Sequence, residues 1–254
     1  MITQDQEEIN LLKKSGRILA EVLQTVAENV RPGISAFELD QLAEREIKKR
    51  GAVGSFKDYK SRPGDPAFPA SLCVSVNDEV VHGIPHKEKV LKQGDIVGLD
   101  LGINYEGYFT DAAITVAVGK ADPEALRLID TARLALNEAL NQAVIGNHIG
   151  DISNAIEQTA KKAGFTPVRD LVGHGVGRSV HEDPEVPCVG KKGTGPLIRK
   201  GMVLAIEPMV NQGTHQIYFD DDNWTVRTVD GGLSAHMEHT VIITDSGAEI
   251  ITKI

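Results

Sequence analysis

Cysteine, basic residues and long hydrophobic runs are all scarce in this sequence. Its 254 residues include two cysteines and no CxxC pair, so it has no disulfide framework and is typical of a reducing compartment. No segment approaches the roughly 18 consecutive apolar residues that span a bilayer. The first ten residues are acidic and polar, unlike a signal or transit peptide. We therefore expect a cytoplasmic protein with no membrane contact.

The charge of the chain disfavours some binding functions, and its aromatic content indicates the type of core. The 27 Lys and Arg residues against 36 Asp and Glu give a net charge of −9, which disfavours nonspecific binding to nucleic acids or anionic membranes. Aromatic residues make up only 4% of the chain, so we expect an aliphatic core. Because roughly 150 residues is typical of a domain, the 254 residues correspond to about 1.7 domains. This length allows one large α/β domain.

Hydrophobic periodicity predicts two pairs of helices, each followed by strands. A capping box at Ser35–Glu38 opens the second helix, and Asp122–Pro123 is a cap and first-turn pair that opens the third. β-branched runs mark the strand regions. The expected helices and strand regions are residues 5–30, 35–50, 71–118, 122–144, 151–163, 202–210, 224–228 and 239–243.

The two halves of the chain carry a weak internal repeat. The stretch 94–100, which ends in an aspartate, matches 201–207, which ends in a glutamate, and 111–119 matches 238–247. In each half of the chain, one acidic residue closes an apolar run and another opens the next run. The repeat therefore puts carboxylates at equivalent positions in both halves.

Two repeats are too few for a solenoid. We therefore expect one α/β domain over residues 1–254, with halves of about 1–120 and 121–254 that share a sheet. Acidic residues at equivalent positions indicate a site at the pseudo-two-fold axis between the halves.

The repeated carboxylates favour a metal site. Asp100 lies within IVGLDLG, where a side chain is expected to be buried, and a buried carboxylate costs several kcal/mol unless it is paired or binds a cation. An ion pair with a buried Arg or Lys is the alternative for any one of them. No matching set of buried basic residues is visible, however, for the four together: Asp100, Asp111, Glu207 and Glu238.

Three histidines lie beside glycine or proline and are further candidates. His174 is in the glycine-rich stretch GHGVGR, His181 follows seven residues later, and His82 precedes Gly83. Taken singly, each could equally be a structural or surface histidine. Four carboxylates with one imidazole suit Mn²⁺, Fe²⁺, Co²⁺ or Zn²⁺, and two such ions can hold a hydroxide nucleophile and polarise a carbonyl. The residues alone thus point to hydrolysis of an amide or related bond.

Together, these motifs resemble type I methionine aminopeptidase across nearly the whole chain. The resemblance implies the pita-bread α/β fold, with two pseudo-symmetric halves of helices packed on a curved, mainly antiparallel sheet. It rests on these stretches: ASLCVSVNDEVVHGIP (70–85), GDIVGLDLG (94–102), YFTDAAITVAVG (108–119), GHGVGR (173–178), HEDPEVP (181–187), GMVLAIEPMV (201–210) and SAHMEHTVIIT (234–244).

The resemblance implies a dinuclear metal centre. Asp111 and Glu238 would bridge two divalent ions, Asp100 would bind one of them, and His174 and Glu207 would complete the other. Mn²⁺, Fe²⁺, Co²⁺ and Zn²⁺ are the implied candidates, and a water or hydroxide that bridges the two ions would attack the first peptide bond.

The resemblance also implies an activity and its catalytic residues. Glu207 would handle the proton of the attacking water, while His82 and His181 would flank the scissile bond, bind substrate and stabilise the tetrahedral intermediate. The substrate would be a short peptide or nascent chain that begins with methionine and has a small second residue. A monomer is expected, and transient ribosome association is a weaker expectation, given the acidic surface.

The methionine pocket is carried over from the same resemblance. Its expected lining is Phe56, Tyr59, Phe68, Cys73 and Trp224, although ordinary core packing is the commoner role of such residues. Between Tyr59 and Phe68 the chain has a longer loop, residues 60–67, than the family pattern leads us to expect.

Two further positions depart from the family pattern. His236 stands where glutamine is usual, and we interpret it as a solvent-exposed histidine rather than a new pocket contact. Val180, directly before His181, stands where an aromatic residue is common. None of the five implied metal ligands is altered.

Two other functions compete with this assignment. An Xaa-Pro peptidase of the same fold usually has a large additional N-terminal domain, and here the first predicted helix begins almost at once. A non-catalytic binding scaffold of this fold would not need all five ligands together with His82 and His181. The enzyme interpretation is therefore favoured.

Overall fold

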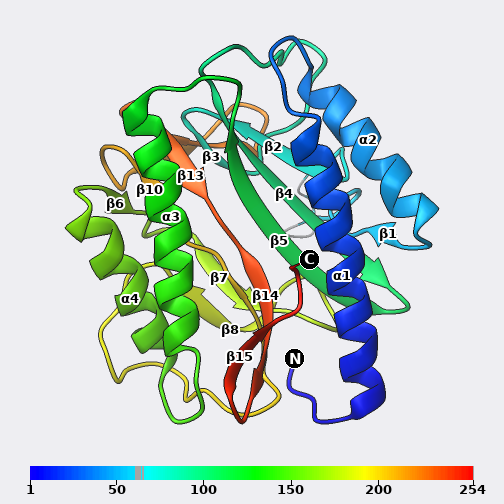
Figure 1. The fold of residues 1–254 in the computed structure, drawn as a ribbon, viewed down its shortest axis with the longest axis vertical. Helices are drawn as coiled ribbons and strands as arrows, with labels where there is room; N and C mark the ends of the chain where they lie inside the picture. Colours follow the sequence, from blue (N-terminus) through cyan, green and yellow to red (C-terminus); the bar gives the residue numbers. More distant parts are fainter. Residues whose placement is uncertain (61–63, 65, 254) are drawn as a thin grey trace.

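The chain folds into helices on one side and antiparallel sheets behind them (Figure 1). The structure is a computed structural model and describes residues 1–60, 64 and 66–253. The described residues form four α-helices, which confirms the four predicted from the sequence: α1 (Gln6–Glu28), α2 (Ala36–Lys49), α3 (Pro123–Gln142) and α4 (Ile149–Lys162).

The helices begin where the sequence supplies caps. The Asp5 side chain accepts hydrogen bonds from the backbone N–H groups of Glu7 and Glu8 at the start of α1. The Ser35–Glu38 capping box forms at α2, and Asp122 caps α3 with proline in its first turn. These bonds satisfy N–H groups that have no partner within the helix.

Every strand pairing among the described residues is antiparallel. The two largest sheets contain β2–β4–β5 with β1, and β15–β14–β9–β7–β8. The strands are β1 (Val53–Gly54), β2 (Leu72–Val76), β3 (Glu79–Val81), β4 (Ile96–Tyr105), β5 (Tyr108–Ala117), β6 (Thr166–Pro167), β7 (Val172–Gly175), β8 (Glu182–Pro187), β9 (Val203–Ile206), β10 (Met209–Asn211), β11 (Ile217–Phe219), β12 (Val226–Thr228), β13 (Ser234–His236), β14 (His239–Thr244) and β15 (Gly247–Ile250).

The repeated stretches become equivalent strand pairs. Strand β4 pairs with β5 in the first half, and β9 pairs with β14 in the second. The pairs are joined where β5 meets β14: the Glu238 N–H donates to the Ala113 carbonyl (2.8 Å), and the Asp111 N–H donates to the Thr240 hydroxyl (2.9 Å). Acidic residues from both halves therefore meet at this junction. The division into one domain of two halves stays a prediction.

The core is aliphatic around both helix pairs, as the composition predicts. One apolar cluster joins α1 and α2 to β2, β4 and β5, and another joins α3 and α4 to β9, β10, β13 and β14. A smaller cluster is rich in aromatic residues and contains Phe56, Phe68 and Trp224. Tyr59 and Phe109 pack against this cluster, so it is the most aromatic part of an otherwise aliphatic interior.

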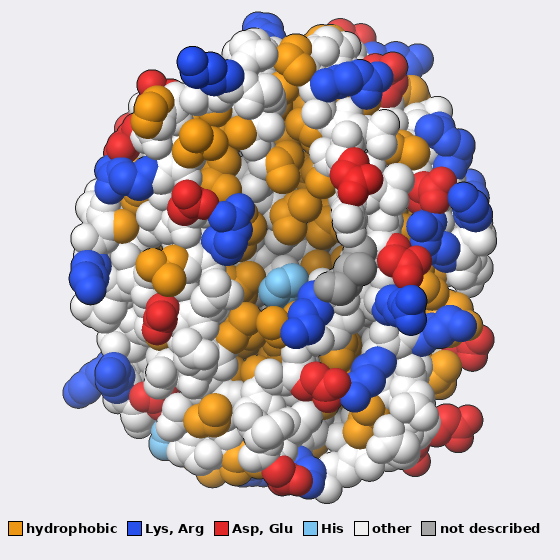
Figure 2. All heavy atoms as spheres, viewed as in Figure 1, with side chains coloured by type: hydrophobic (Ala, Val, Ile, Leu, Met, Phe, Trp, Pro, Cys, Tyr) orange, Lys and Arg blue, Asp and Glu red, His pale blue; other side chains and the backbone are white. Residues whose placement is uncertain are grey.

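The helix-bearing surface is mixed in charge and has an apolar groove along its middle. Figure 2 shows Lys and Arg side chains interspersed with Asp and Glu around this face, with hydrophobic side chains between them. Leu23, Ala27 and Ile114 are among the residues that line the part of the groove between α1 and β5. Within the described part of the chain, no helix combines the length and hydrophobicity that crossing a bilayer requires.

Candidate metal centre

Strands β4 and β5 place two aspartates on the same face of their sheet. Asp100 is paired with Ala113, and Asp111 is paired with Gly102. Directly paired residues lie on one face, and so do residues two apart on a strand, so the two carboxyl groups project to the same side. Both aspartates are buried. The β4–β5 register therefore brings together two of the five predicted ligands.

The second half supplies the other three ligands from neighbouring strands. His174 lies on β7, which pairs with β9. Glu207 directly follows β9, and Glu238 directly precedes β14. Because Ile206 pairs with His239, the two glutamates stand at adjacent strand ends. Local strand order thus brings an imidazole and two carboxylates to the junction with β5.

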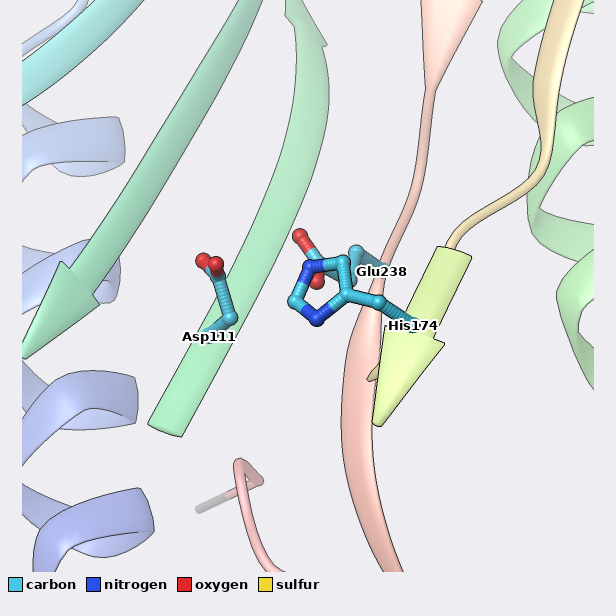
Figure 3. A group of neighbouring side chains, drawn as sticks. All are labelled: Asp111, His174 and Glu238. Atoms are coloured by element: carbon cyan, nitrogen blue, oxygen red, sulfur yellow. The ribbon is translucent and has the colours of Figure 1, made fainter. Parts of the chain in front are cut away.

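Three of these side chains form a compact group that could hold a cation. One ligand atom from each of Asp111, His174 and Glu238 lies within 4.8 Å of the other two, and the side chains converge in Figure 3. His174 Nε2 also lies 3.6 Å from Glu207 Oε1. The Nδ1 atom of His174 lies 2.8 Å from the Gly175 carbonyl. An N–H at Nδ1 would donate to that carbonyl and leave the Nε2 lone pair free to bind metal.

The acidic side chains lack partners that would stabilise their charge. Asp100 Oδ1, Asp111 Oδ1 and Glu238 Oε1 are fully buried and accept no hydrogen bond from any described residue. The Glu207 carboxyl group lies beside two histidines, His174 and His236, whose imidazoles are neutral because burial lowers their pKa values to about 3. Uncompensated carboxylates are costly in such surroundings. Among the described residues, no Arg or Lys forms an ion pair with any of these four carboxylates. The donor set therefore fits divalent metal ions.

Burial and mutual repulsion keep protons on the carboxylates when no cation is present. The pKa of Glu207 is raised to about 8 by burial, and that of Asp111 to about 7 by burial and the nearby Glu207. The pKa values of Asp100 and Glu238 are also raised well above the ordinary range. Burial lowers the pKa of His174 to about 3, so its imidazole is neutral. A neutral imidazole is the form that binds metal.

All twelve predicted site residues line one cavity. Since these residues come from segments far apart in the sequence, their convergence is a property of the tertiary fold. They are Phe56, Tyr59, Phe68, Cys73, His82, Asp100, Asp111, His174, His181, Glu207, Trp224 and Glu238.

One side of the cavity is apolar. Phe56, Phe68, Cys73 and Trp224 belong to a single buried cluster that also contains Val180, so the valine found in place of an aromatic residue packs with the residues of this wall. The ring of Phe68 meets that of Trp224 edge to face, with 5.3 Å between centroids. The cavity therefore has a closely packed apolar wall beside its four carboxylates.

The loop next to this wall is only partly described. Of the longer loop predicted at 60–67, residues 61–63 and 65 lie outside the described residues. Phe56 and Tyr59 nevertheless line the cavity. Gly102 leaves room for Phe56, because a Cβ there would come within 2.6 Å of the Phe56 ring.

His82 and His181 face the same cavity from different segments. His82 has a left-handed backbone (φ 58°), and its ring lies 6.2 Å from that of Trp224 in an edge-to-face arrangement. Burial lowers its pKa to about 4. The His181 ring meets that of His174 at 4.4 Å between centroids, and burial lowers its pKa as well. Both rings are therefore neutral hydrogen-bonding groups beside the metal-binding side chains.

The interpretation of His236 as a solvent-exposed histidine is wrong. Its side chain is 3% exposed, and its Nε2 lies 3.3 Å from Glu207 Oε2. The sequence does carry a signal for this position, since His236 lies two residues before Glu238 and an extended segment directs such residues to the same side. The departure from glutamine therefore falls next to a predicted ligand rather than on the surface.

Comparisons with known proteins agree with this geometry. A family model described as Metallopeptidase family M24 matches residues 10–245. A methionine aminopeptidase of Aquifex aeolicus (strain VF5) is 50% identical, over 98% of this chain and 97% of its own length. The crystal structure of methionine aminopeptidase from Thermotoga maritima has a TM-score of 0.95 and 44% identity, with 100% of both chains covered. An Xaa-Pro dipeptidase from Bacillus anthracis has a TM-score of 0.78 and 24% identity, and 62% of that chain is covered; this likeness concerns the fold alone.

Proposed function

Because the chain belongs to metallopeptidase family M24 and shares extensive identity with methionine aminopeptidases, we propose that it hydrolyses the first peptide bond of peptides that begin with methionine. It has the pita-bread fold of that family. The observation that carries the proposal is the group of buried, unpaired carboxylate oxygens beside an apolar wall within one cavity. Peptides with a small second residue are the proposed substrates.

Two divalent ions are the proposed cofactor. Asp111 and Glu238 would contact both ions, Asp100 would hold one, and His174 and Glu207 would complete the other. An oxygen-rich donor set with one imidazole suits Mn²⁺, Fe²⁺, Co²⁺ or Zn²⁺. Such ions, when bound, polarise the scissile carbonyl and lower the pKa of water.

Glu207 is the proposed proton carrier. Burial raises the pKa of its carboxyl group to about 8 only in the metal-free fold. With divalent ions bound the carboxyl group would be ionised, and an ionised carboxylate can accept a proton from water. It accepts a proton from the attacking water and delivers it to the nitrogen of the departing peptide. The His236 imidazole packs against the Glu207 carboxyl group, with 3.3 Å between Nε2 and Oε2 but no hydrogen bond, and so limits the orientations open to this carboxyl group.

His82 and His181 are the proposed substrate-binding and catalytic histidines. Both line the cavity with the acidic residues, and both are neutral because burial lowers their pKa values. A neutral imidazole offers one N–H donor and one acceptor nitrogen. One N–H can therefore donate to the scissile carbonyl oxygen and donate more strongly once that oxygen becomes negatively charged.

The apolar wall is the proposed recognition site for the methionine side chain. Phe56, Phe68, Cys73 and Trp224 offer a buried surface of aromatic and sulfur groups, and a thioether makes favourable contacts with aromatic rings. Tyr59 completes this lining at the cavity. The free amino group of the substrate would then lie toward the carboxylates.

The test compares two substrates with metal-stripped protein. Free methionine released from Met-Ala-Ser is measured after adding back Mn²⁺, Fe²⁺, Co²⁺ or Zn²⁺ separately, and an Xaa-Pro dipeptide is assayed in parallel. Metal-dependent release from the tripeptide alone is expected. Hydrolysis of the Xaa-Pro dipeptide alone would move the assignment to a proline-specific peptidase. No hydrolysis of either, with two ions bound, would favour a binding scaffold.

The cellular setting is proposed on the same basis. Nascent chains and short peptides with N-terminal methionine are the expected partners, in the cytoplasm, with the protein acting as a monomer. Transient contact with the ribosome would bring it to nascent chains. Co-sedimentation with translating ribosomes and a sedimentation-velocity measurement would test these two points separately.

A further inference from the structure

Tyr59 makes a polar contact with one of the two cavity histidines. Its hydroxyl oxygen lies 2.7 Å from Nδ1 of His181, although the residues are 122 positions apart in the sequence. The ring centroids are 5.2 Å apart, at an interplanar angle of 57°. Within the described part of the chain, the hydroxyl has no other hydrogen-bonding partner. This contact goes beyond the lining of a methionine pocket, because it engages a specific nitrogen of His181.

The backbone holds Tyr59 in place for this contact. The Asp58 N–H donates to the Phe68 carbonyl and the Phe68 N–H donates to the Tyr59 carbonyl, both at 2.9 Å. The Tyr59 N–H donates to the Phe56 carbonyl, also at 2.9 Å. Phe68 in turn packs against Trp224. Backbone hydrogen bonds therefore tie Tyr59 to Phe56 and Phe68, two residues of the apolar wall.

The turn that carries His181 is stabilised by its own hydrogen bonds. The Glu182 carboxylate accepts hydrogen bonds from the backbone N–H groups of Arg178 (2.6 Å) and Ser179 (2.8 Å), which fixes the turn that carries the histidine. The His181 ring packs edge to face against His174, a proposed metal ligand. With Tyr59 at Nδ1, the nitrogen left for other partners is Nε2.

We propose that Tyr59 is a positioning residue for His181, whose Nδ1 accepts a hydrogen bond from the Tyr59 hydroxyl and whose Nε2 therefore carries the hydrogen. A neutral imidazole has one N–H, so acceptance at Nδ1 requires the N–H to be at Nε2. An Nε2–H donates to the scissile carbonyl oxygen as negative charge develops there. The opposite tautomer would direct a lone pair at that charge.

The chemistry of the two groups favours this direction of donation. A phenol O–H is a good donor and a bare imidazole nitrogen a good acceptor. In the reverse arrangement, with Nδ1–H donating to the phenol oxygen, the hydroxyl hydrogen would have no acceptor among the described residues. The inference rests on the proposed function, in which His181 lies beside the scissile bond.

The experiment compares Tyr59→Phe with Tyr218→Phe, a change in an exposed tyrosine of β11 (45% exposed). Tyr59→Phe keeps the ring in the cavity wall and removes only the hydroxyl. We expect kcat for Met-Ala-Ser to fall about five- to tenfold, the effect of one lost hydrogen bond, with KM within about twofold and bound metal unchanged. Tyr218→Phe should match the parent protein.

A second measurement reads the tautomer directly. In ¹⁵N-histidine spectra of zinc-loaded protein, His181 should be the Nε2–H tautomer in the parent and a mixture of tautomers in Tyr59→Phe. An unchanged tautomer in Tyr59→Phe would overturn the proposal, and so would a rise in KM with normal kcat, because Tyr59 would then be only a wall of the pocket.

A separate variant tests the proposed function independently. Normal turnover in His181→Ala would remove the catalytic role of that histidine. The tautomer spectra of Tyr59→Phe would in that case still report whether the hydrogen bond exists.

Discussion

Removal of the metal should make the stability of this protein fall as the pH rises above neutral. In the metal-free fold, burial raises the pKa of Glu207 from its ordinary 4.5 to about 8. A raised pKa means that the folded chain binds this proton more tightly than the unfolded chain does. The associated stability is therefore present below the unfolded value and is lost as the pH rises through about 8.

The size of the effect follows from that pKa. At pH 7, about ten elevenths of the folded chains hold this proton, whereas the unfolded chain is ionised. An increase to pH 9 removes on the order of 1 kcal/mol from the free energy of unfolding through this group. Asp111, with a pKa of about 7, adds a fraction of a kcal/mol over the same interval. Five histidines have lowered pKa values. In the unfolded chain roughly a quarter of each is protonated at pH 7, so together they offset somewhat less than about 1 kcal/mol of the fall. The raised pKa values of Asp100 and Glu238 add to the fall in the same direction as Glu207.

Urea denaturation of metal-stripped protein at pH 7 and pH 9 measures this loss. Glu207→Gln is the matched control, since it keeps the shape of the side chain and removes its titration. Between pH 7 and pH 9 this variant should lose less stability than the parent, by on the order of 1 kcal/mol. Protein loaded with metal should not show the fall, because its ligands are ionised throughout. Stripped parent protein that is equally or more stable at pH 9 would refute the assignment of a buried, protonated carboxyl group.

Substitutions at three positions test individual roles. Asp111→Asn should abolish loading of two ions and lower activity at least about 100-fold while the circular dichroism spectrum stays native; near-normal turnover would exclude a bridging role. His181→Ala should lower kcat about 100-fold or more with metal content unchanged, and loss of metal instead would identify this residue as structural support for the centre. His236→Leu should lower kcat about tenfold because the polar neighbour of the Glu207 carboxyl group is lost, while His236→Gln, which keeps a polar side chain there, should retain most activity. Equal activities of the two His236 variants would argue against that contact.

The sequence by itself determined the elements and the chemical type of the site. Caps such as Ser35 with Glu38 and the 3.6-residue periodicity are local signals, so the helices could be predicted from neighbouring residues. The repeated carboxylates, Asp100 with Glu207 and Asp111 with Glu238, were also visible as a linear pattern. Because a buried acid needs compensation wherever it lies, this pattern was enough to predict a divalent-metal site before any contact was known.

Only the tertiary structure decided which groups touch. The burial of His236 against Glu207 depends on how the segment before β14 packs, which composition does not encode locally. The bond from Tyr59 to His181 joins residues 122 positions apart, and no periodicity links them. Strand register and loop closure determine such contacts, since a shift of one residue would turn a side chain to the opposite face of its sheet. The residue types follow from the one-dimensional pattern, and their hydrogen-bonding partners follow from the packing.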